Sequence, residues 1–328
     1  MIVTLTPNPS VDRTVEVERL KLGAISRATG GRVDTGGKGV NIAAALVSHG
    51  RPALAVFPCG GPEGEQLALM LDQAGIATVQ VPVVGSTRAN VTIVEAHGTV
   101  TKLNELGPEL EQSEIDALID ATVVAARRAE WVVCCGSLPP GVADDFYALV
   151  MARISASDTR VAVDTSGQAL LKALTTSPDV VKPNCEELAA ATGIAITTLG
   201  DAVDAARALR DRGAKTVIAS LGRDGALYVD GARTVHAEAA VDLPRSSVGA
   251  GDALLAGFLC NGGSGVDAFA IGVAWAAAAV RLPGTRMPGP QQVDYSVVRV
   301  HDVIQADRAL GNKAVTTLGD LGVGGSHE

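Results

Sequence analysis

Short apolar runs alternate with longer amphipathic stretches along most of this chain. The runs are rich in Val and Ile and carry few polar residues, which is typical of strands buried on both faces of a parallel sheet. The strands predicted on this basis are Ile2–Leu5, Ala53–Phe57, Trp131–Cys135, Arg160–Val163, Val180–Val181 and Thr216–Ser220. Strand, helix and strand repeated in this order predict right-handed crossovers, and therefore an α/β fold with a mostly parallel sheet and helices on both faces.

The stretches between these runs follow a helical period. Across Glu114–Ala129, apolar and small residues recur about every 3.6 positions, which predicts an amphipathic helix with Ser113 as its N-cap. The apolar run Ala268–Val280 is shorter than the roughly 20 residues that a membrane span requires. We therefore predict a buried helix there and no membrane partner.

Two segments depart from this alternation. Residues from about 11 to 35 and from about 86 to 104 alternate with a period of two, which is typical of β-ribbons, and residues 96–99 predict a hairpin turn. Because both segments are inserted between core elements, we expect them to form a small sheet that covers the active site as a lid.

The last third of the chain contains a further hairpin and a tail. The hairpin is predicted over Gly225–Val235, with its turn at Asp230 and Gly231. Residues 311–328 are rich in Gly, Thr and Ser and lack periodicity, so we expect a mobile tail there. Residues 1–310 are predicted to form one domain that carries the two insertions.

Composition narrows the class of protein. Of the 328 residues, 47% are hydrophobic and 19% charged, which predicts a folded globular chain. The net charge of −9, without a basic cluster, argues against nucleic acid as a partner. Five cysteines without a C-x-x-C pair fit no disulfide framework, and the five scattered histidines argue against a zinc site. The strand-like start lacks the features of a signal peptide, so a cytoplasmic protein is expected.

The most informative local pattern is the run from Ser246 to Asp252, followed at once by small apolar residues. Two glycines before an apolar run predict a tight loop that opens into a helix, whose first amides lack partners and attract an anion. Asp252 lies in that first turn, where it could take a proton from a hydroxyl that attacks a phosphoryl group. The alternative is a simple turn with Asp252 as a helix cap.

A second glycine-rich turn, Gly36–Gly39, runs into an Ala-rich helix. Its glycines would let the backbone approach a ligand that Lys38 and Asn41 face. The turn is not a Walker A loop, because Gly37 stands where the lysine belongs, and no G-x-G-x-x-G precedes a helix. Ligand binding and a purely structural turn both remain open for this segment.

Two charged residues near the predicted lid are further candidates. Asp12 follows the first predicted strand, and a carboxylate at the carboxyl end of a parallel strand suits ligand hydroxyls. Arg88 begins a lid strand and offers a bidentate fork for a phosphate. The alternative for each is a solvated surface charge.

Two strand ends in the second half of the chain are nucleotide-site candidates. After Val181, Asn184 can cap a helix with Glu187 three residues on, as in a capping box. Alternatively, these two side chains organise water and Mg²⁺ beside a nucleotide, since Mg²⁺ takes few carboxylates and keeps several waters. The glycine-flanked turn Ser220–Ala226 could hold a nucleotide's phosphates or ribose.

Taken together, these motifs resemble those of the ribokinase-like (PfkB-type) sugar kinases in order and spacing, over roughly residues 1–305. The matching stretches are Gly36–Asn41, Gly136–Gly141, Asp164–Gly167, Lys182–Asn184, Ser220–Gly222 and Val248–Asp252. The opening Thr4–Asp12 is similar to the phosphosugar branch of that family, which includes 1-phosphofructokinases, tagatose-6-phosphate kinases and the minor 6-phosphofructokinases. Lys102–Pro108 is most similar to 1-phosphofructokinases, in which an Asn-Glu-x-Gly-Pro string is usual.

The resemblance implies a three-layer ribokinase-like fold and ATP-dependent phosphorylation of a ketohexose phosphate, with fructose 1-phosphate converted to fructose 1,6-bisphosphate as the first expectation. It also implies Mg²⁺ and a homodimer formed through the lid. Kinases for tagatose 6-phosphate or fructose 6-phosphate are the near alternatives. Lys38 and Arg88 argue against a neutral nucleoside or sugar as substrate, and the intact Gly-Ala-Gly-Asp argues against a non-catalytic nucleotide-binding protein.

The resemblance also implies roles for individual residues. Asp252 would be the general base, and the amides of Gly249, Ala250 and Gly251 would form the anion hole. The sugar would be bound by Asp12, Gly37, Lys38 and Asn41, with Arg88 and Ser137 near its phosphate. ATP would lie along Lys182, Asn184, Ser220, Gly222 and Gly225, and Glu187 would act through Mg²⁺-bound water. The chain departs from the family pattern at Ser247, where Thr is usual, and at residues 276–279, which lack the Asn often found near adenine.

Overall fold

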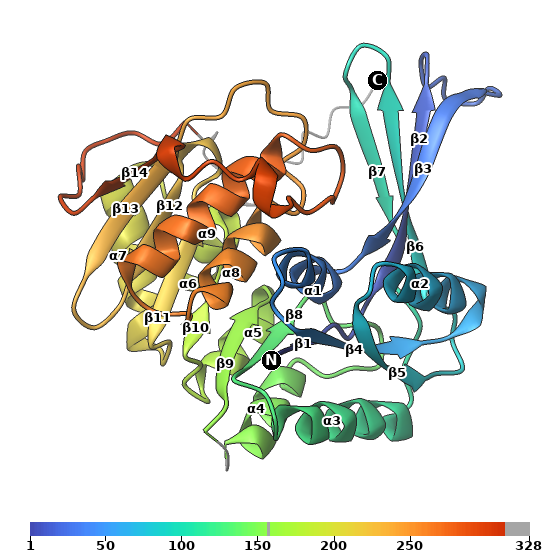
Figure 1. The fold of residues 1–328 in the computed structure, drawn as a ribbon, viewed down its shortest axis with the longest axis horizontal. Helices are drawn as coiled ribbons and strands as arrows, with labels where there is room; N and C mark the ends of the chain where they lie inside the picture. Colours follow the sequence, from blue (N-terminus) through green and yellow to red (C-terminus); the bar gives the residue numbers. More distant parts are fainter. Residues whose placement is uncertain (156–157, 312–328) are drawn as a thin grey trace, which may run out of the picture.

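In the computed structural model, which describes residues 1–155 and 158–311, the chain forms a large and a small sheet (Figure 1). The large sheet has ten strands in the order β14-β13-β12-β11-β10-β9-β8-β1-β4-β5. These are β1 (Ile2–Leu5), β4 (Ala53–Cys59), β5 (Ala77–Pro82), β8 (Trp131–Cys135), β9 (Arg160–Asp164), β10 (Val180–Val181), β11 (Thr216–Ser220), β12 (Ala226–Val229), β13 (Thr234–Ala239) and β14 (Val298–His301). The predicted tail beyond residue 311 lies outside the described residues.

The sheet is parallel from β5 to β11 and antiparallel from β11 to β14. Every strand predicted from the apolar runs belongs to the parallel part, so the predicted α/β class is confirmed. The predicted hairpin is the β12–β13 pair, and Asp230 closes its turn by accepting from the amides of Ala232 and Arg233, each at 2.7 Å.

Helices cover both faces of the large sheet, because alternate residues of each buried strand point to opposite sides. Val132 and Cys134 of β8 pack into one buried cluster, and Trp131 and Val133 pack into the other. The first cluster includes α3 (Gln112–Ala126), α4 (Phe146–Ile154), α5 (Gly167–Leu174), α6 (Cys185–Thr192) and α7 (Leu199–Asp211). The second includes α1 (Lys38–Ser48), α2 (Gly61–Gln73), α8 (Ala250–Cys260) and α9 (Gly265–Val280).

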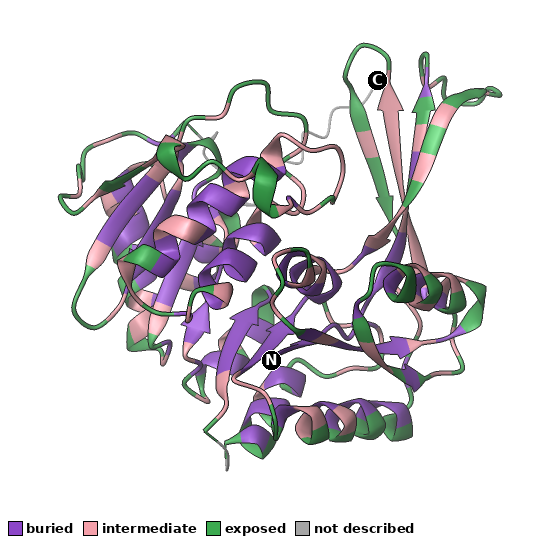
Figure 2. Cartoon of the chain, viewed as in Figure 1, coloured by how far each residue is buried: buried purple, intermediate pink, exposed green. Residues whose placement is uncertain are grey.

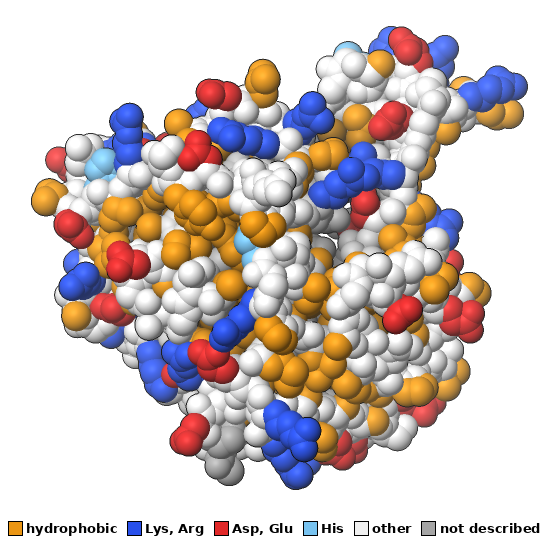
Figure 3. All heavy atoms as spheres, in the orientation of Figure 1, with side chains coloured by type: hydrophobic (Ala, Val, Ile, Leu, Met, Phe, Trp, Pro, Cys, Tyr) orange, Lys and Arg blue, Asp and Glu red, His pale blue; other side chains and the backbone are white. Residues whose placement is uncertain are grey.

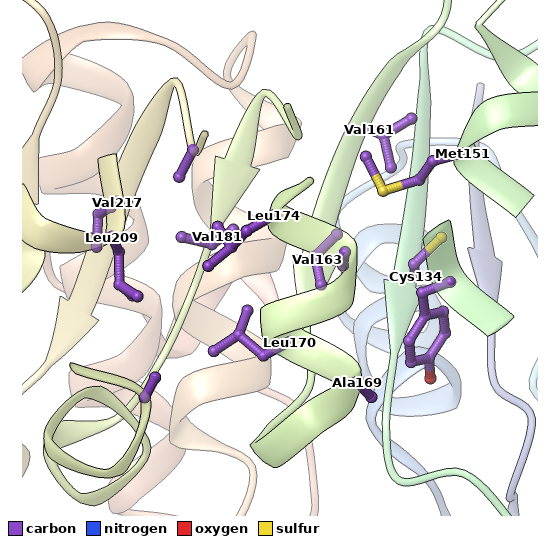
Figure 4. Packing of buried hydrophobic residues seen from close by; sticks show 14 of the residues in the cluster. Cys134, Met151, Val161, Val163, Ala169, Leu170, Leu174, Val181, Leu209 and Val217 are labelled. Carbon is purple, nitrogen blue, oxygen red and sulfur yellow. The ribbon is translucent and has the colours of Figure 1, made fainter. Parts of the chain in front are cut away.

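Figure 2 shows these buried layers, with exposed residues on the outer helix faces, the loops, the small sheet and the edge strands β5 and β14 of the large sheet. In Figure 4, Leu170 and Leu174 of α5 lie beside Val163 of β9 and Val181 of β10. Aromatic residues make up only 3% of the chain, and its short aliphatic side chains suit this close packing of helix on sheet.

Two helix predictions can be compared directly with the structure. The predicted buried helix over 268–280 is confirmed as α9, and within the described residues no helix is both long and apolar enough to span a membrane. The prediction that Ser113 caps the helix near 114 was wrong. Helix α3 begins two residues earlier than predicted, at Gln112. The Glu111 carbonyl accepts from the Glu114 amide at 3.0 Å, and Glu114 Oε2 accepts from the Glu111 amide at 2.9 Å, so Glu111 is the N-cap.

The small sheet combines the two segments predicted as β-ribbons. Its strands are β2 (Ser10–Val17), β3 (Ala28–Gly36), β6 (Arg88–Glu95) and β7 (Val100–Asn104), in the order β3-β2-β6-β7. Residues 96–99 form the turn between β6 and β7, as predicted. The sheet extends from the body of the molecule as an arm with charged side chains near its tip (Figure 3).

Candidate active site

The carboxyl ends of the parallel strands and the base of the small sheet enclose a cleft of about 1100 Å³. The structure brings every site residue predicted from the sequence to the wall of this cleft. They are Asp12, Gly37, Lys38, Asn41, Arg88, Ser137, Lys182, Asn184, Glu187, Ser220, Gly222, Gly225, Gly249, Ala250, Gly251 and Asp252.

The first turn of α8 opens directly on the cleft. Its N-cap, Gly249, has a φ of +81°, a left-handed conformation that favours glycine. Amides in a first helical turn have no intrahelical acceptor, and the amide of Ala250 makes only a long 3.4 Å hydrogen bond to the carbonyl of Ser247. The turn can therefore present its N–H groups and its positive dipole end to an anion.

Asp252 lies in this same turn and is only 7% exposed. Its Oδ2 accepts a hydrogen bond from Nδ2 of Asn41 at 2.8 Å, which joins α8 to the glycine-rich turn at the start of α1. Burial, together with the negative charge of Asp164, raises the pKa of Asp252 to about 6. A carboxylate of this kind is ionised at neutral pH and is a stronger base than an exposed one.

Asp164, at the carboxyl end of β9, is the central charge of the cleft floor, and sequence analysis assigned it no role. It is fully buried and is paired with Lys38 Nζ at 2.6 Å and with Lys182 Nζ at 3.1 Å. Burial by itself would raise the pKa of Asp164, but the two ammonium groups outweigh it and lower the pKa below its ordinary value. The signal that could have identified it is an acidic residue at the end of a Val-rich strand.

The lysines on either side of Asp164 are held by it. Burial opposes the charged form of Lys38, but the carboxylates of Asp164 and Glu187 outweigh burial and raise the pKa of Lys38 above its ordinary value. Lys182 lies against the first turn of α8. A Cβ atom placed on Gly251 of this turn would be only 2.9 Å from Lys182 Nζ. The anion-attracting turn therefore has Lys182 against it, and Lys38 interacts electrostatically with Asp252 of the same turn.

At the small-sheet end of the cleft, a hydrogen-bond network holds Asp12. Its Oδ1 accepts from Ser10 Oγ at 2.7 Å and from Asn90 Nδ2 at 3.0 Å. Ser10 and Asn90, which were not predicted from the sequence, also line the cleft. No local pattern marks either residue, since the parallel pairing of β2 with β6 is what brings Asn90 opposite Asp12.

Arg88 closes the same end of the cleft. It donates to the carbonyls of Glu105 at 2.9 Å and Asn8 at 3.1 Å, while its buried Nε has no hydrogen-bond partner within the described residues. Burial lowers the pKa of Arg88 below its usual value, although the guanidinium stays charged. Asn8, another residue that sequence analysis missed, donates to Ser137 Oγ at 3.3 Å.

The opposite end of the cleft is apolar on one side and polar on the other. Its apolar wall consists of Ala239, Val241, Pro244, Val273, Ala276, Ala277 and Val280. Ala276 and Ala277 belong to an all-alanine stretch, residues 276–279, so this part of the wall carries no amide side chain. The facing polar side carries the turn at η1 (Gly222–Asp224) and the start of α6.

At the start of α6, Asn184 and Glu187 form the capping box expected from their spacing. Asn184 Oδ1 accepts from the Glu187 amide at 2.8 Å, and Glu187 Oε2 accepts from the Asn184 amide at 2.9 Å. The other carboxylate oxygen, Oε1, lies 3.5 Å from Lys38 Nζ and faces the cleft. The capping box uses Oε2 of Glu187, so Oε1 can accept hydrogen bonds from groups in the cleft.

Comparisons with known proteins agree on one family. A family model described as pfkB family carbohydrate kinase matches residues 6–292. The chain is 39% identical to a 1-phosphofructokinase of Haloferax volcanii, covering 89% of this chain and 95% of that protein, and 35% identical to an ATP-dependent 6-phosphofructokinase isozyme 2 of Mycobacterium tuberculosis, covering 87% and 85%. Among solved structures, phosphofructokinase-2 from Escherichia coli in complex with potassium matches with a TM-score of 0.83 and 32% identity, covering 89% of this chain and 96% of that one.

Proposed function

Because the chain belongs to the pfkB family of carbohydrate kinases and is an ATP-dependent sugar-phosphate kinase, we propose that its substrate is fructose 1-phosphate, which it converts to fructose 1,6-bisphosphate. The convergence of Asp252, the first turn of α8 and the Lys38–Asp164–Lys182 cluster in one cleft carries the proposed phosphoryl transfer, and the similarity to 1-phosphofructokinases carries the choice of sugar. Phosphoryl transfer needs positioning and charge neutralisation more than covalent chemistry, and these groups supply both.

Asp252 acts as the general base in this mechanism. As the sugar hydroxyl oxygen attacks the γ-phosphorus of ATP, its proton passes to the Asp252 carboxylate. A new P–O bond forms to the sugar, and the bond between the γ-phosphorus and the bridging oxygen of ADP breaks. The hydrogen bond from Asn41 fixes the orientation of the carboxylate, so that it is in place before the hydroxyl arrives.

The amides of Gly249, Ala250 and Gly251 stabilise the charge that develops on the transferred phosphoryl group. They are fixed by the helix and need no rearrangement during the reaction, which is the condition for efficient electrostatic stabilisation. Lys182, against the same turn, adds a positive charge on the ATP side.

The small-sheet end of the cleft binds the phosphosugar. Asp12, Gly37, Lys38 and Asn41 contact its hydroxyls, and Arg88 and Ser137 contact its phosphate. In favour of fructose 1-phosphate, the string Asn104–Pro108, most similar to 1-phosphofructokinases, lies beside this end. The Glu105 carbonyl accepts from Arg88, and a Cβ on Gly107 would come within 2.3 Å of Asn8 Oδ1.

The opposite end binds ATP. Asn184, Ser220, Gly222 and Gly225 lie along its ribose and phosphates, and the apolar wall of Val273, Ala276, Ala277 and their neighbours accepts the adenine ring. With alanines in place of an amide side chain, adenine is held here by apolar contact, without a side-chain hydrogen bond from this helix.

The residues present fit a Mg²⁺ ion bound with the nucleotide. Mg²⁺ keeps several waters and takes few protein carboxylates, and Glu187 offers one carboxylate oxygen to the cleft while its other oxygen caps α6. Glu187 would hold the ion through its bound water. When bound, the ion neutralises negative charge on the phosphate oxygens of ATP.

The small sheet serves as a lid and as the contact between two copies of the chain. The sheet and its β2–β3 loop expose apolar side chains that a second copy would cover, namely Leu22, Ile25, Val33, Val100 and Leu103. Covering an exposed strand edge also prevents uncontrolled pairing. We therefore propose a homodimer. Phosphofructokinase-2 of Escherichia coli also has a tetrameric inhibited form, so sedimentation with and without ATP is the test of assembly.

A coupled ADP-release assay tests the substrate. The proposal expects kcat/KM for fructose 1-phosphate to exceed that for fructose 6-phosphate and for tagatose 6-phosphate, the two alternatives within the family. A higher kcat/KM for either of these would replace fructose 1-phosphate as the substrate but would leave the mechanism unchanged. No turnover with any of the three would contradict the proposed mechanism as well.

A further inference from the structure

Three side chains of the residue types that ligate metals lie together on the large sheet, outside the positions proposed for sugar phosphate and ATP in the cleft. His236 and Glu238 of β13 and His301 of β14 each offer a ligand atom, and these atoms lie within 4.8 Å of one another. His236 and His301 are direct cross-strand partners, and Glu238 follows two residues later on the same face as His236. Although the histidines are scattered in the sequence, the β13–β14 pairing brings two of them together.

The hydrogen bond of His236 fixes which of its ring nitrogens is free for a metal. Its Nε2 lies 2.7 Å from the carbonyl oxygen of Asp224. A carbonyl oxygen only accepts, so Nε2 must carry the proton, and Nδ1 keeps its lone pair. A histidine that ligates a metal usually donates its other N–H to a carbonyl or carboxylate in this way.

Glu238 is held in the same manner. Its Oε2 accepts from Arg308 at 2.9 Å, and its Oε1 faces His301 Nε2 at 3.3 Å. Two ligands bound tetrahedrally to one zinc ion, each at about 2.0–2.1 Å, lie roughly 3.3 Å apart. The separation of these two atoms is therefore that of neighbouring ligands, and the second oxygen of the carboxylate has the support that ligating carboxylates normally have.

We propose that His236, Glu238 and His301 bind one transition-metal dication, with zinc as the ion best suited to two imidazoles and a carboxylate. His301 and Glu238 are 39% and 30% exposed, so a water completes the coordination from the solvent side. The nearby arginines, Arg308 and the cross-strand neighbour Arg299, oppose a cation. We therefore expect weaker binding than at a structural site with four protein ligands.

The ion would act as a structural brace near the ATP end of the cleft. His236 holds the carbonyl of Asp224, which belongs to η1, and the glycines on either side of Asp224, Gly222 and Gly225, line the cleft. Fixing His236 therefore restricts the turn proposed to lie along ATP. Metal binding itself requires neither substrate, so its failure would leave the proposed kinase function untouched.

Isothermal titration of the full-length, metal-free protein without a histidine tag tests the proposal, with ZnCl₂ as the ligand. We expect one zinc per chain, and a Kd at least about 10-fold weaker in both His301→Gln and Glu238→Gln. The matched control is His97→Gln, an exposed histidine at the tip of the β6–β7 hairpin, which should bind zinc as the unaltered chain does.

Two further measurements complete the test. Co²⁺ added in place of zinc should give the intense visible absorption of tetrahedral coordination in the unaltered chain and in His97→Gln but not in the other two variants. All variants should keep the kinase rate measured with Mg²⁺, ATP and fructose 1-phosphate in the absence of zinc, which shows that they fold. Absence of saturable zinc binding, or equal affinity in the unaltered chain, His301→Gln and Glu238→Gln, would overturn the proposal.

Discussion

Lys38 donates a 2.6 Å hydrogen bond to Asp164, across 126 positions of sequence, and this ion pair forms the floor of the cleft. Asp164 is fully buried and also pairs with Lys182. In the described part of the chain, it is the only carboxylate that forms an ion pair with both lysines. The pairing keeps two positive charges inside the cleft without leaving either unpaired, and it places a negative charge near Asp252 that raises the pKa of that residue.

Removing the Asp164 charge should destabilise the protein. In Asp164→Asn, the buried Lys182 and the partly buried Lys38 lose their shared partner, which typically costs about 3–5 kcal/mol of unfolding free energy. Urea denaturation at pH 7.5 measures the change. The control is Asp120→Asn, whose ion pair with Arg153 is more than half exposed and should contribute at most about 1 kcal/mol. Equal stability of the two variants would contradict the structural role of Asp164.

Asp252→Asn should lower kcat by roughly 10²–10⁴, the usual contribution of a positioned general base, with little change in KM for either substrate. The variant should not be less stable at pH 7.5. Burial raises the pKa of Asp252 to about 6, so the free energy of unfolding decreases as the pH rises through this value and the carboxyl group ionises. A neutral amide does not ionise and therefore avoids this loss of stability. Near-normal turnover by the folded variant would exclude Asp252 as the base.

The pH dependence of kcat/KM should follow the ionisation of Asp252. The base is active when ionised, so kcat/KM should be constant above its pKa and fall tenfold per pH unit below about 6. The negative charge of Asp164 is one cause of the raised pKa, so any residual activity of Asp164→Asn should persist to lower pH. Initial rates between pH 5 and 9 in buffers of constant ionic strength provide the measurement, and an acid limb centred near the ordinary Asp value would refute the assignment.

Arg88→Ala should weaken binding of the phosphosugar specifically. Loss of a charged hydrogen bond costs about 1.5–3 kcal/mol, which corresponds to an increase in KM of roughly 10- to 150-fold. The KM for ATP should stay the same, because Arg88 lies at the small-sheet end of the cleft.

The matched control for this variant is Arg13→Ala. Arg13 lies on the adjacent strand β2, is 47% exposed, and pairs only loosely with Glu63 at 3.6 Å. Its replacement should leave both KM values unchanged. If Arg88→Ala raised KM equally for a phosphosugar and for the corresponding unphosphorylated sugar, Arg88 would not be a phosphate ligand.

Much of the fold and part of the site follow from local sequence. The Val-rich runs determine the parallel strands because such segments are stable only when covered on both faces. Likewise, the glycines before Asp252 determine where α8 begins, because Gly249 adopts a left-handed conformation. The error at Ser113 has a local cause too, since the N-cap is Glu111, whose amide donates to the Glu114 carboxylate, where the hydroxyl of Ser113 was expected to cap the helix.

Only the tertiary structure decided which charges and polar groups meet. The Asp164 cluster joins strands and helices that are far apart in the chain, and Asn90 reaches Asp12 through the register of β2 with β6. The sequence determined the elements and most candidate residues, since those depend on neighbours within one turn or strand. Partners, burial and the resulting pKa values depend on how the elements pack, and that is set by long-range contacts which no local pattern encodes.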